Sequence, residues 1–379
     1  MIVAYNALAV RPGVADGAAT FSLNVVPELA AALPEHRLVA LVRPGEDRLE
    51  ARANLTLRPV AGVSSLGRRI RFELLELRRC LDELAADVLV LPSELVVRGG
   101  TPVVVVAQNL AYHCDRHGVS FVGATPRDRL GARLQRAYYR ALMPVAFRRA
   151  ARVAAVSHTA ADVLSRRAGL DLGKTSVIGE GADSRLLPPP GIDAHRDDRL
   201  LIVSALAPYK GIDRALRIFG AVRRRLPGLQ LDVVGGSWRG YGRVLRAEVA
   251  RLGLDAHVHF HEHASARELA AHYQRAALLV HLSECESFGL PVVEAMRYRL
   301  PVAAADRPWA RETGGEAVLV LPDHDAAAAD TIVSLLHDRA QQDALAARGA
   351  LRAAKLTWRA TADRLAQLVH EAAATAGRG

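Results

Sequence analysis

Two glutamates, Glu286 and Glu294, flank a short apolar stretch and are the clearest candidates for chemistry in this chain. The run before them, residues 276–283, is apolar enough for a buried strand. The run after Gly289 has the pattern of a helix whose first turn contains Pro291. A loop that leads from a strand into a helix normally favours anions, because backbone N–H groups and the helix dipole point toward it. Two fixed carboxylates at such a place are unexpected and require an explanation.

The elements that would position these carboxylates alternate between strand and helix twice along the chain. In the first half, short apolar runs begin at residues 1, 37, 87, 101, 152 and 174, and the alternation restarts at residue 200. Continuous apolar strands separated by helices predict parallel sheets that are covered on both faces. Because 379 residues exceed what one hydrophobic core usually supports, we expect two doubly wound domains.

The expected domain boundaries follow from this alternation. Residues 1–183 form the first domain, a proline-rich linker covers 184–199, and the second domain covers 200–359. A C-terminal helix at about residues 360–379 is expected to pack back on the first domain.

Four candidate residues follow or end predicted strands, where ligands of such sheets bind. Gly17 lies between the first strand and a helix, and His113 follows the run 101–109. Lys210 follows the run 200–208, and Glu286 follows the run 277–283. If the two sheets face each other, these loops lie along a cleft between the domains.

Composition excludes several classes of protein. No apolar run reaches the roughly 18 residues of a membrane-spanning helix, and the N-terminus has no signal-peptide pattern. The three cysteines are far apart and have neither metal-ligand nor redox spacing. We therefore expect a cytoplasmic protein. The net charge of +10 indicates anionic partners, which could be nucleotides, nucleic acid or a lipid surface.

Several segments resemble one enzyme family. The stretch "ECESFGLPVVEAM" resembles the Glu–seven residues–Glu motif of the family-4 glycosyltransferases, which are retaining enzymes of the GT-B fold. The stretch "YKGIDRALRIF" resembles the family's Lys-Gly segment, and "WRATADRL" resembles its Trp-containing segment before the last helix. The similarity spans nearly the whole chain. It implies an α/β protein with two facing Rossmann-like domains, an interdomain cleft, and a nucleotide-sugar site in the second domain.

The resemblance implies a function as well as a fold. The chain would transfer a hexose from a nucleoside-diphosphate sugar to an acceptor hydroxyl, in bacterial glycan, glycolipid or glycosylated natural-product biosynthesis. The acceptor would be a carbohydrate, a lipid-linked sugar or a small molecule.

The resemblance also accounts for the two carboxylates. Glu294 would hold the ribose and Glu286 the donor sugar, since a carboxylate accepts strong hydrogen bonds from neighbouring hydroxyls. The loop between them would bind sugar oxygens and phosphates through backbone N–H groups, and its residues are Ser287, Phe288, Gly289 and Leu290.

Three further residues receive roles from the resemblance. Lys210 would neutralise the departing diphosphate, Gly17 would present its N–H to the phosphates, and His113 would reach the donor sugar. Lys210, Glu286 and His113 are then the expected catalytic residues. The alternatives are a solvated role for Lys210 and a structural role for His113.

One position departs from the family pattern. Family members often carry an arginine five residues before the Lys-Gly segment, and this chain has Ala205 there. Arg214 is the nearest candidate to replace it, because it shares a helical face with Lys210 if a helix begins at Lys210.

The implied reaction retains the anomeric configuration and needs neither metal nor cofactor, since the nucleotide sugar is a co-substrate. No Asp or Glu is placed as a covalent nucleophile, so we expect front-face attack, with the leaving phosphate taking the acceptor's proton. No Asp-x-Asp metal motif is evident, and Lys210 with helix dipoles would replace a cation.

Two other classes of protein stay open. One is a nucleotide-sugar isomerase or epimerase on the same fold, which would interconvert the donor without an acceptor. The other is a membrane or nucleic-acid binder on a degenerate scaffold. Aromatic residues make up 5% of the chain and no nucleic-acid motif is present, so we expect no nucleic-acid partner.

A basic segment raises the question of membrane contact. Residues 127–152 contain eight arginines and a single acid, with apolar residues at roughly helical spacing. This pattern predicts either a peripheral helix on the anionic inner face of the membrane or a core-packing helix with a solvated basic face.

Overall fold

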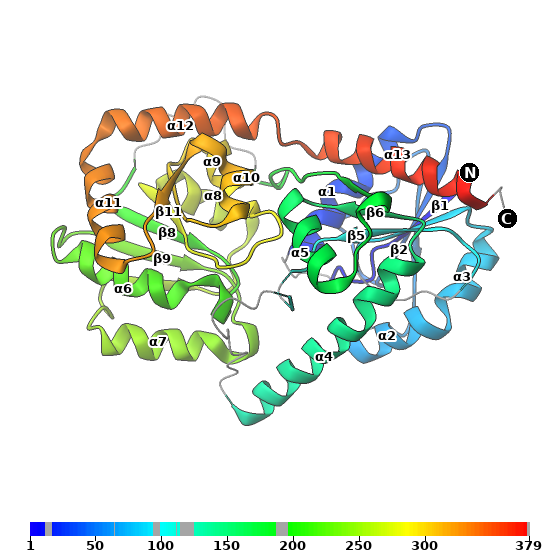
Figure 1. Cartoon of the computed structure of the whole chain (residues 1–379), viewed down its shortest axis with the longest axis horizontal. Coiled ribbons are helices and arrows are strands. Elements are labelled where there is room, and N and C mark those ends of the chain that lie inside the picture. The colour runs from blue at the N-terminus through cyan, green and yellow to red at the C-terminus, as the bar shows by residue number, and fades with distance from the viewer. Residues whose placement is uncertain are drawn as a thin grey trace. The chain divides into compact units, whose positions relative to one another are not determined.

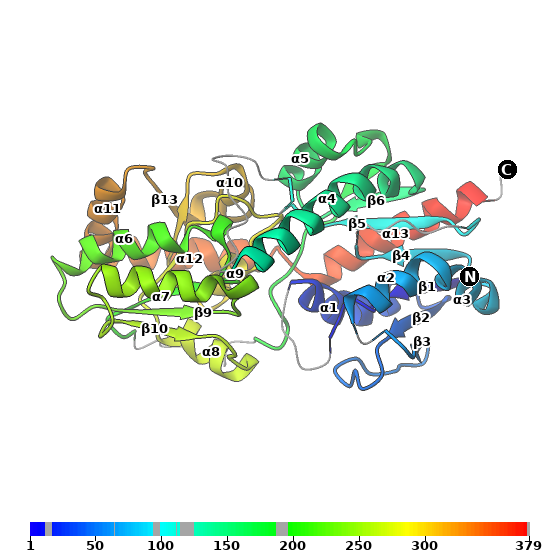
Figure 2. The ribbon, with the colours of Figure 1, turned by 90° about the horizontal axis from the view of Figure 1, so that it is seen from below.

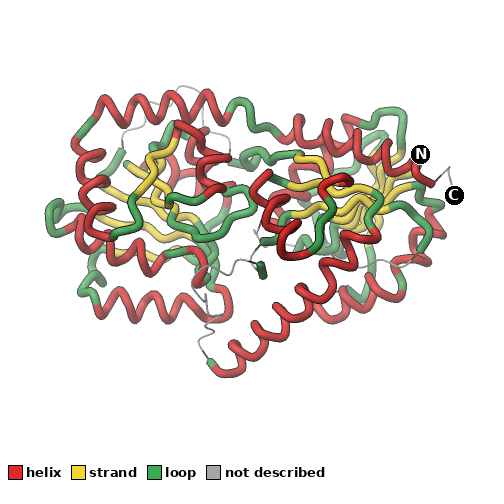
Figure 3. Tube along the Cα trace, viewed as in Figure 1, coloured by secondary structure: helices red, strands yellow, loops and turns green. Residues whose placement is uncertain are grey.

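The computed structural model describes residues 1–11, 17–63, 65–93, 99–110, 112–113, 125–186 and 196–376. The chain divides into two compact units, each with its own sheet (Figures 1 and 3). The first unit comprises Met1–His113, Ala137–Glu180 and Thr357–Gly379, and the second comprises Cys114–Arg136 and Gly181–Leu356. Most of the expected linker, residues 187–195, lies outside the described residues.

The first unit contains a parallel sheet in the order β3-β2-β1-β4-β5-β6-β7. Its strands are β1 (Ile2–Asn6), β2 (Arg37–Val42), β3 (Leu55–Pro59), β4 (Val88–Leu91), β5 (Val103–Ala107), β6 (Arg152–Ala155) and β7 (Thr175–Val177). Its helices are α1 (Gly17–Ala32), α2 (Leu66–Leu75), α3 (Leu77–Leu84), α5 (His158–Ala168) and α13 (Trp358–Ala376). Helix α4 (Pro126–Arg149) is divided between the two units, and its residues from Ala137 onward belong to the first.

The second unit contains a parallel sheet in the order β10-β9-β8-β11-β12-β13. Its strands are β8 (Arg199–Val203), β9 (Gln230–Val234), β10 (Val258–His261), β11 (Leu278–His281), β12 (Val302–Ala305) and β13 (Val318–Leu321). Its helices are α6 (Ile212–Arg223), α7 (Tyr241–Arg251), α8 (Ala266–Arg275), α9 (Leu290–Arg297), α10 (Pro308–Gly314), α11 (Asp325–His337) and α12 (Arg339–Ala353).

The prediction of two doubly wound α/β sheets is confirmed. In both sheets the central strands are continuous buried runs, as in β4 and β12, because helices cover both faces (Figure 2). The sequence missed β3, whose run "LTLRP" contains Arg58 and ends in Pro59. A partly exposed strand at the edge of a sheet tolerates both, so it lacks the apolar signature of the others.

The strand order locates the expected ligand site within the second sheet. Successive strands β8, β9 and β10 run toward one edge, whereas β11, β12 and β13 run toward the other. The order therefore reverses between β8 and β11. In doubly wound folds, ligands bind outside the carboxyl ends of the strands at this reversal.

Helix α13 belongs to the first unit, although it follows the whole second unit in sequence. It packs along α1, where the rings of Phe21 and Trp358 meet edge to face with centroids 5.6 Å apart. Thr361 Oγ1 donates to the Gly179 carbonyl at 3.3 Å, and Arg364 donates to the Ile178 carbonyl at 3.0 Å. Helix α13 thus completes the core of the first unit.

Among the described residues, no helix is long and apolar enough to cross a membrane.

Candidate functional site

The loops after β8 and β11 are joined directly. The segment Pro208–Lys210 forms a short 3-10 turn, and Gly211 follows it in the left-handed region at φ +64°. A Cβ at Gly211 would lie 2.3 Å from the Leu282 carbonyl oxygen, so only glycine permits this approach. The Glu284 N–H also donates to the Tyr209 carbonyl at 2.9 Å. This packing brings Lys210 to the carboxyl end of β11.

Lys210 forms an ion pair with Glu286 at the reversal between β8 and β11. The Lys210 ammonium lies 2.7 Å from Glu286 Oε1 and 2.8 Å from Oε2. His281, the last residue of β11, places Nε2 2.9 Å from the same Oε1. Lys210 and Glu286 have side chains only 13% and 10% exposed, and His281 is fully buried at 2%. We call these three residues the Lys210–Glu286–His281 cluster.

The cluster keeps Glu286 ionised. Burial alone raises the pKa of Glu286, but the charge of Lys210 and the hydrogen bond with His281 outweigh it and lower the pKa to about 2. Burial lowers the pKa of Lys210, but the adjacent Glu286 carboxylate outweighs it, so the net shift is upward. The site therefore holds a fixed carboxylate beside a fixed ammonium across the physiological pH range.

Glu294 lies in a different environment, in the second turn of α9. It is 6% exposed, and its Oε2 accepts a hydrogen bond of 2.6 Å from the Tyr273 hydroxyl. Burial raises the pKa of Glu294 to about 7, and the Tyr273 hydrogen bond opposes this shift without cancelling it. The two glutamates of the motif thus differ in charge state near neutral pH.

The loop between the glutamates is held by buried contacts. Gly289 caps α9 at φ +94°, and a Cβ there would lie 3.2 Å from the Trp309 ring. Trp309 donates from Nε1 to the Ser283 carbonyl at 3.0 Å, and Thr313 Oγ1 donates to the Phe288 carbonyl. Pro291 lies in the first turn of α9, as predicted. These contacts fix the backbone of Ser287, Phe288, Gly289 and Leu290 before any ligand binds.

The two candidates of the first unit occupy described positions. Gly17 is the first residue of α1 and is exposed, so its N–H lies in the first turn of a helix, as expected. His113 is 1% exposed, and its Nε2 lies 3.0 Å from Met143 Sδ. Their roles toward a ligand stay predictions.

The prediction that Arg214 shares a helical face with Lys210 required a helix beginning at Lys210, and this requirement is not met. The left-handed Gly211 separates the turn of Lys210 from α6, which begins at Ile212, so the two residues do not share a helical face. Arg214 instead donates to Asp325 Oδ1 at 2.9 Å and to the Pro322 carbonyl at 2.7 Å. It joins α6 to the start of α11. Ala205 is exposed and lies two residues after the end of β8.

Three site residues were not found from the sequence. His281 falls within the apolar run 276–283 that the sequence predicts as a strand, and Tyr273 received no role from the sequence. Arg307 follows β12 and makes two hydrogen bonds to Glu284, at 2.7 and 2.9 Å. A histidine ending an otherwise apolar strand was an available signal. The contacts of Tyr273 and Arg307 depend on packing between distant segments and left no local signal.

The fold and this cluster define a class of protein: a two-domain α/β protein whose second domain carries a charged Lys–Glu site at its topological reversal. Two family models match the chain. "Glycosyltransferase Family 4" matches residues 15–186, and "Glycosyl transferases group 1" matches residues 191–352. The chain belongs to the family-4 glycosyltransferases of the GT-B fold.

Curated relatives match part of the chain. A D-inositol 3-phosphate glycosyltransferase of Kineococcus radiotolerans is 32% identical over 222 residues, covering 52% of this chain and 51% of that protein. A protein of the same name from Frankia alni is 37% identical over 205 residues, covering 51% and 49%. The matches therefore span about half the length of these relatives.

Solved structures share the fold over the whole chain. Sucrose-phosphate synthase from Thermosynechococcus elongatus has a TM-score of 0.75 at 19% identity and covers 99% of both chains. The glycosyltransferase WaaG, involved in lipopolysaccharide biosynthesis, has a TM-score of 0.73 at 17% identity and covers 97% of this chain and 99% of its own. Anabaena HepE in complex with UDP-glucose has a TM-score of 0.68 at 18% identity and covers 97% and 98%. At these identities the likeness shows the fold alone, and it confirms the GT-B prediction.

Proposed function

We propose that this protein is a retaining glycosyltransferase that moves a hexose from a nucleoside-diphosphate sugar to an acceptor hydroxyl. The observation that carries the proposal is the Lys210–Glu286–His281 cluster at the reversal between β8 and β11. A diphosphate needs a cation, and a hexose needs hydrogen-bond acceptors. Lys210 and Glu286 supply both within 2.8 Å of each other.

The donor's entry changes the partners of Lys210. In the protein without ligand, the ammonium is shared by both oxygens of Glu286. When the diphosphate binds, its oxygens compete for the ammonium. Glu286 is then released to accept hydrogen bonds from sugar hydroxyls while His281 keeps its orientation. As the bond to the sugar breaks, negative charge grows on the phosphate and the interaction with Lys210 strengthens, which lowers the barrier.

Glu294 is assigned to the ribose. Its carboxylate lies in α9, eight residues after Glu286, and its Oε2 already accepts from the Tyr273 hydroxyl. Two neighbouring ribose hydroxyls would donate to this carboxylate once it is ionised. The proposed chemistry uses no metal and no cofactor. The leaving phosphate takes the proton of the acceptor hydroxyl on the same face of the sugar.

The names of the relatives and neighbours narrow the substrates to be tried first. UDP-glucose is bound by the Anabaena neighbour, and the curated relatives are named for D-inositol 3-phosphate. We therefore propose a UDP-sugar donor and a polyol or carbohydrate acceptor.

A thermal-shift screen over UDP-, GDP-, ADP- and dTDP-sugars tests the donor, and product analysis with D-inositol 3-phosphate tests one acceptor. Incubation with the donor alone provides the control. If the donor is interconverted without an acceptor, the protein is an isomerase and the proposal fails.

Peripheral membrane contact is a second part of the proposal, and helix α4 supports it. The predicted basic helix is present as Pro126–Arg149, although Arg152 already begins β6. Leu130 and Leu134 are 58% and 62% exposed on this helix, beside the exposed Arg127 and Arg133. An apolar strip flanked by arginines suits the surface of an anionic bilayer.

Sedimentation with vesicles containing phosphatidylglycerol, compared with phosphatidylcholine vesicles, tests this contact. Replacing Leu130 and Leu134 by Ser should release the protein from anionic vesicles. Leu351→Ser in α12 is the matched control, since Leu351 is 70% exposed. Equal sedimentation of the wild-type protein with both kinds of vesicle at low salt would contradict the proposed membrane contact.

A further inference from the structure

A polar patch occupies the face of the second sheet that α8 covers. The histidines of the β10 region recur at every second position, as His257, His259, His261 and His263, so those within the strand point to one face. His259 pairs in register with Asp232 of β9, whose side chain therefore lies on the same face. A face packed against a helix in a doubly wound sheet is normally apolar. Burying polar groups there costs free energy unless they acquire partners.

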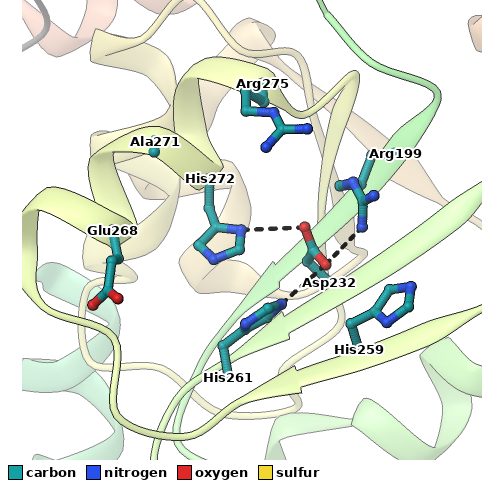
Figure 4. A pocket seen from close by; sticks show the side chains of 8 residues that line it. All are labelled: Arg199, Asp232, His259, His261, Glu268, Ala271, His272 and Arg275. Carbon is teal, nitrogen blue, oxygen red and sulfur yellow. Dashed lines mark hydrogen bonds and ion pairs between the residues drawn. The ribbon is translucent and has the colours of Figure 1, made fainter.

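This patch lines an open pocket of about 360 Å³ between the sheet and α8 (Figure 4). We call it the α8 pocket, and its lining includes Arg199, Asp232, His259, His261 and His272. None of them belongs to the Lys210–Glu286–His281 cluster or to the loop that follows it.

Two histidines of the α8 pocket, which belong to different elements, each place a ring nitrogen near the same carboxylate. His261 Nε2 lies 3.1 Å from Asp232 Oδ1, and His272 Nδ1 lies 3.1 Å from Asp232 Oδ2. Their rings have centroids 4.5 Å apart. Figure 4 shows the two rings converging on Asp232, one from β10 and the other from α8. Two imidazole nitrogens and one carboxylate oxygen thus lie within 4.8 Å of one another.

We propose that Asp232, His261 and His272 bind a divalent transition-metal ion of the Zn²⁺ type. Ligands on a tetrahedral zinc with bonds of 2.0–2.2 Å are separated by about 3.4 Å from each other. The distance from His261 Nε2 to Oδ1 and that from His272 Nδ1 to Oδ2, both 3.1 Å, are close to that separation and involve the two oxygens of one carboxylate. Two histidines with one carboxylate are also a common zinc ligand set, whose fourth position is open to water.

The surroundings of Asp232 suit the role of a ligand. Arg199 donates from Nη1 to Asp232 Oδ1 at 2.8 Å; the same Oδ1 faces His261, and Oδ2 faces His272. Metal-binding carboxylates are usually oriented by such a second hydrogen bond. The Asp232 side chain is 6% exposed, whereas that of His261 is 38% exposed. An ion can therefore reach the site from the side of His261.

The bound ion would connect two elements of the second unit. It would link β10, the edge strand of the sheet, to α8, which packs over it. The ion is not part of the proposed transfer reaction, and the inference holds or fails independently of that reaction.

Titration of the metal-free, tag-free protein with Zn²⁺ by calorimetry tests the inference. We expect one ion per chain and a rise in melting temperature, because binding to the folded state stabilises it. His261→Ala and His272→Ala should each weaken binding at least about 100-fold, since losing a direct ligand should cost no less than losing a second-shell partner.

His259→Gln is the matched control, because His259 lines the same pocket but its Nε2 contacts Gln230 at 3.1 Å. It should bind Zn²⁺ as wild type does. If the His261 or His272 variant also binds as wild type does, or if wild type binds no ion, the inference is overturned and the groups form a hydrogen-bonded network only.

A measurement on wild type decides the matter even if a variant misfolds. X-ray absorption of the Zn²⁺-loaded protein should show two imidazole ligands together with oxygen. A ligand shell with no imidazole, or with three or more, would contradict the assignment.

Discussion

In the proposed mechanism the Lys210 ammonium, which contacts Glu286 in the structure, moves to the diphosphate when the donor binds, so its removal should affect both states. We expect Lys210→Ala to lower transfer at least about a hundredfold, or about 2.7 kcal/mol of transition-state stabilisation. Steady-state kinetics with the donor found in the screen checks this value. Lys355→Ala is the control, because Lys355 is an exposed lysine of the same unit. Near-normal transfer by the Lys210 variant would mean that the diphosphate is held elsewhere.

Alanine substitutions of the two glutamates should have different effects on nucleotide binding. Glu294→Ala should weaken binding of the free nucleoside diphosphate, because the ribose is present in it. Glu286→Ala should leave that binding intact or tighten it, because Lys210 then loses the carboxylate that competes with phosphate. Turnover should fall in both variants. Calorimetry with the nucleoside diphosphate separates the two effects, and equal losses of affinity would contradict the assignment.

Protonation of Glu294 should make donor binding depend on pH. Burial raises its pKa to about 7, so the carboxyl is neutral below that pH and accepts fewer hydroxyl hydrogen bonds. If only the ionised form of Glu294 binds the ribose, the affinity for the nucleotide sugar rises as pH passes through the pKa of Glu294. The expected rise is about tenfold from pH 6 to pH 8. Calorimetry with the nucleotide sugar measures this rise. Glu294→Gln should abolish it, and an unchanged slope in that variant would assign the titration to another group.

The same shift has the opposite consequence for stability. Because the folded-state pKa of Glu294 lies above its ordinary value of 4.5, the folded protein holds more protons than the unfolded chain between pH 4.5 and about 7. The contribution of Glu294 to the free energy of unfolding therefore falls as pH rises through this window. Glu286, with its pKa lowered to about 2, contributes stability that is lost as pH falls from 4.5 toward 2.

At the scale of elements, the loop after β8 depends on one glycine. We expect Gly211→Ala to lower both stability and transfer, because the added Cβ would displace the loop from the Leu282 carbonyl and move Lys210 from Glu286. Gly253→Ala is the matched control. Gly253 has nearly the same backbone angle, φ +66°, but nothing within 4 Å of its Cβ position, so it should lose about 1 kcal/mol of stability and no activity.

Thermal melting and transfer rates compare the two glycine variants. Equal melting temperatures and equal activity would show that the loop reaches its place without the close approach at Gly211.

Prediction from the sequence succeeded for the buried strands and failed for an edge strand and for one turn. Buried parallel strands were found because most residues between two helical layers are apolar, as in "VLVL" of β4. The edge strand β3 was missed because exposure removes that constraint. Lys210 and Glu286 were each placed in a loop after a strand, but their pairing depends on β8 and β11 being neighbours, which no local pattern encodes. The position of Arg214 was misjudged because one left-handed residue, Gly211, changes the direction of the chain.

At the scale of the whole molecule, the first unit depends on a helix far away in sequence. Trp358 is 6% exposed against Phe21, and Leu365 and Val369 of α13 are fully buried. We expect Trp358→Ala to cost the first unit about 3–5 kcal/mol, as for other buried aromatic residues. Limited proteolysis of the full chain should then cut the first unit earlier than the second.

Trp238→Ala, which alters a half-buried tryptophan of the second unit, is the control for this experiment. If Trp358→Ala made both units equally sensitive, or neither, the dependence of the first unit on α13 would be disproved.

The return of α13 to the first unit also has a consequence for biosynthesis. Residues 1–180 leave the ribosome first, but the helix that covers Phe21 is made only after the whole second unit. At roughly 5–20 residues per second, the interval between residue 180 and residue 358 lasts about 9–36 s. During that time the nascent first unit exposes the apolar surface that α13 will cover. We therefore expect the first unit to complete its core only after the second unit has been synthesised, and to expose this apolar surface until then.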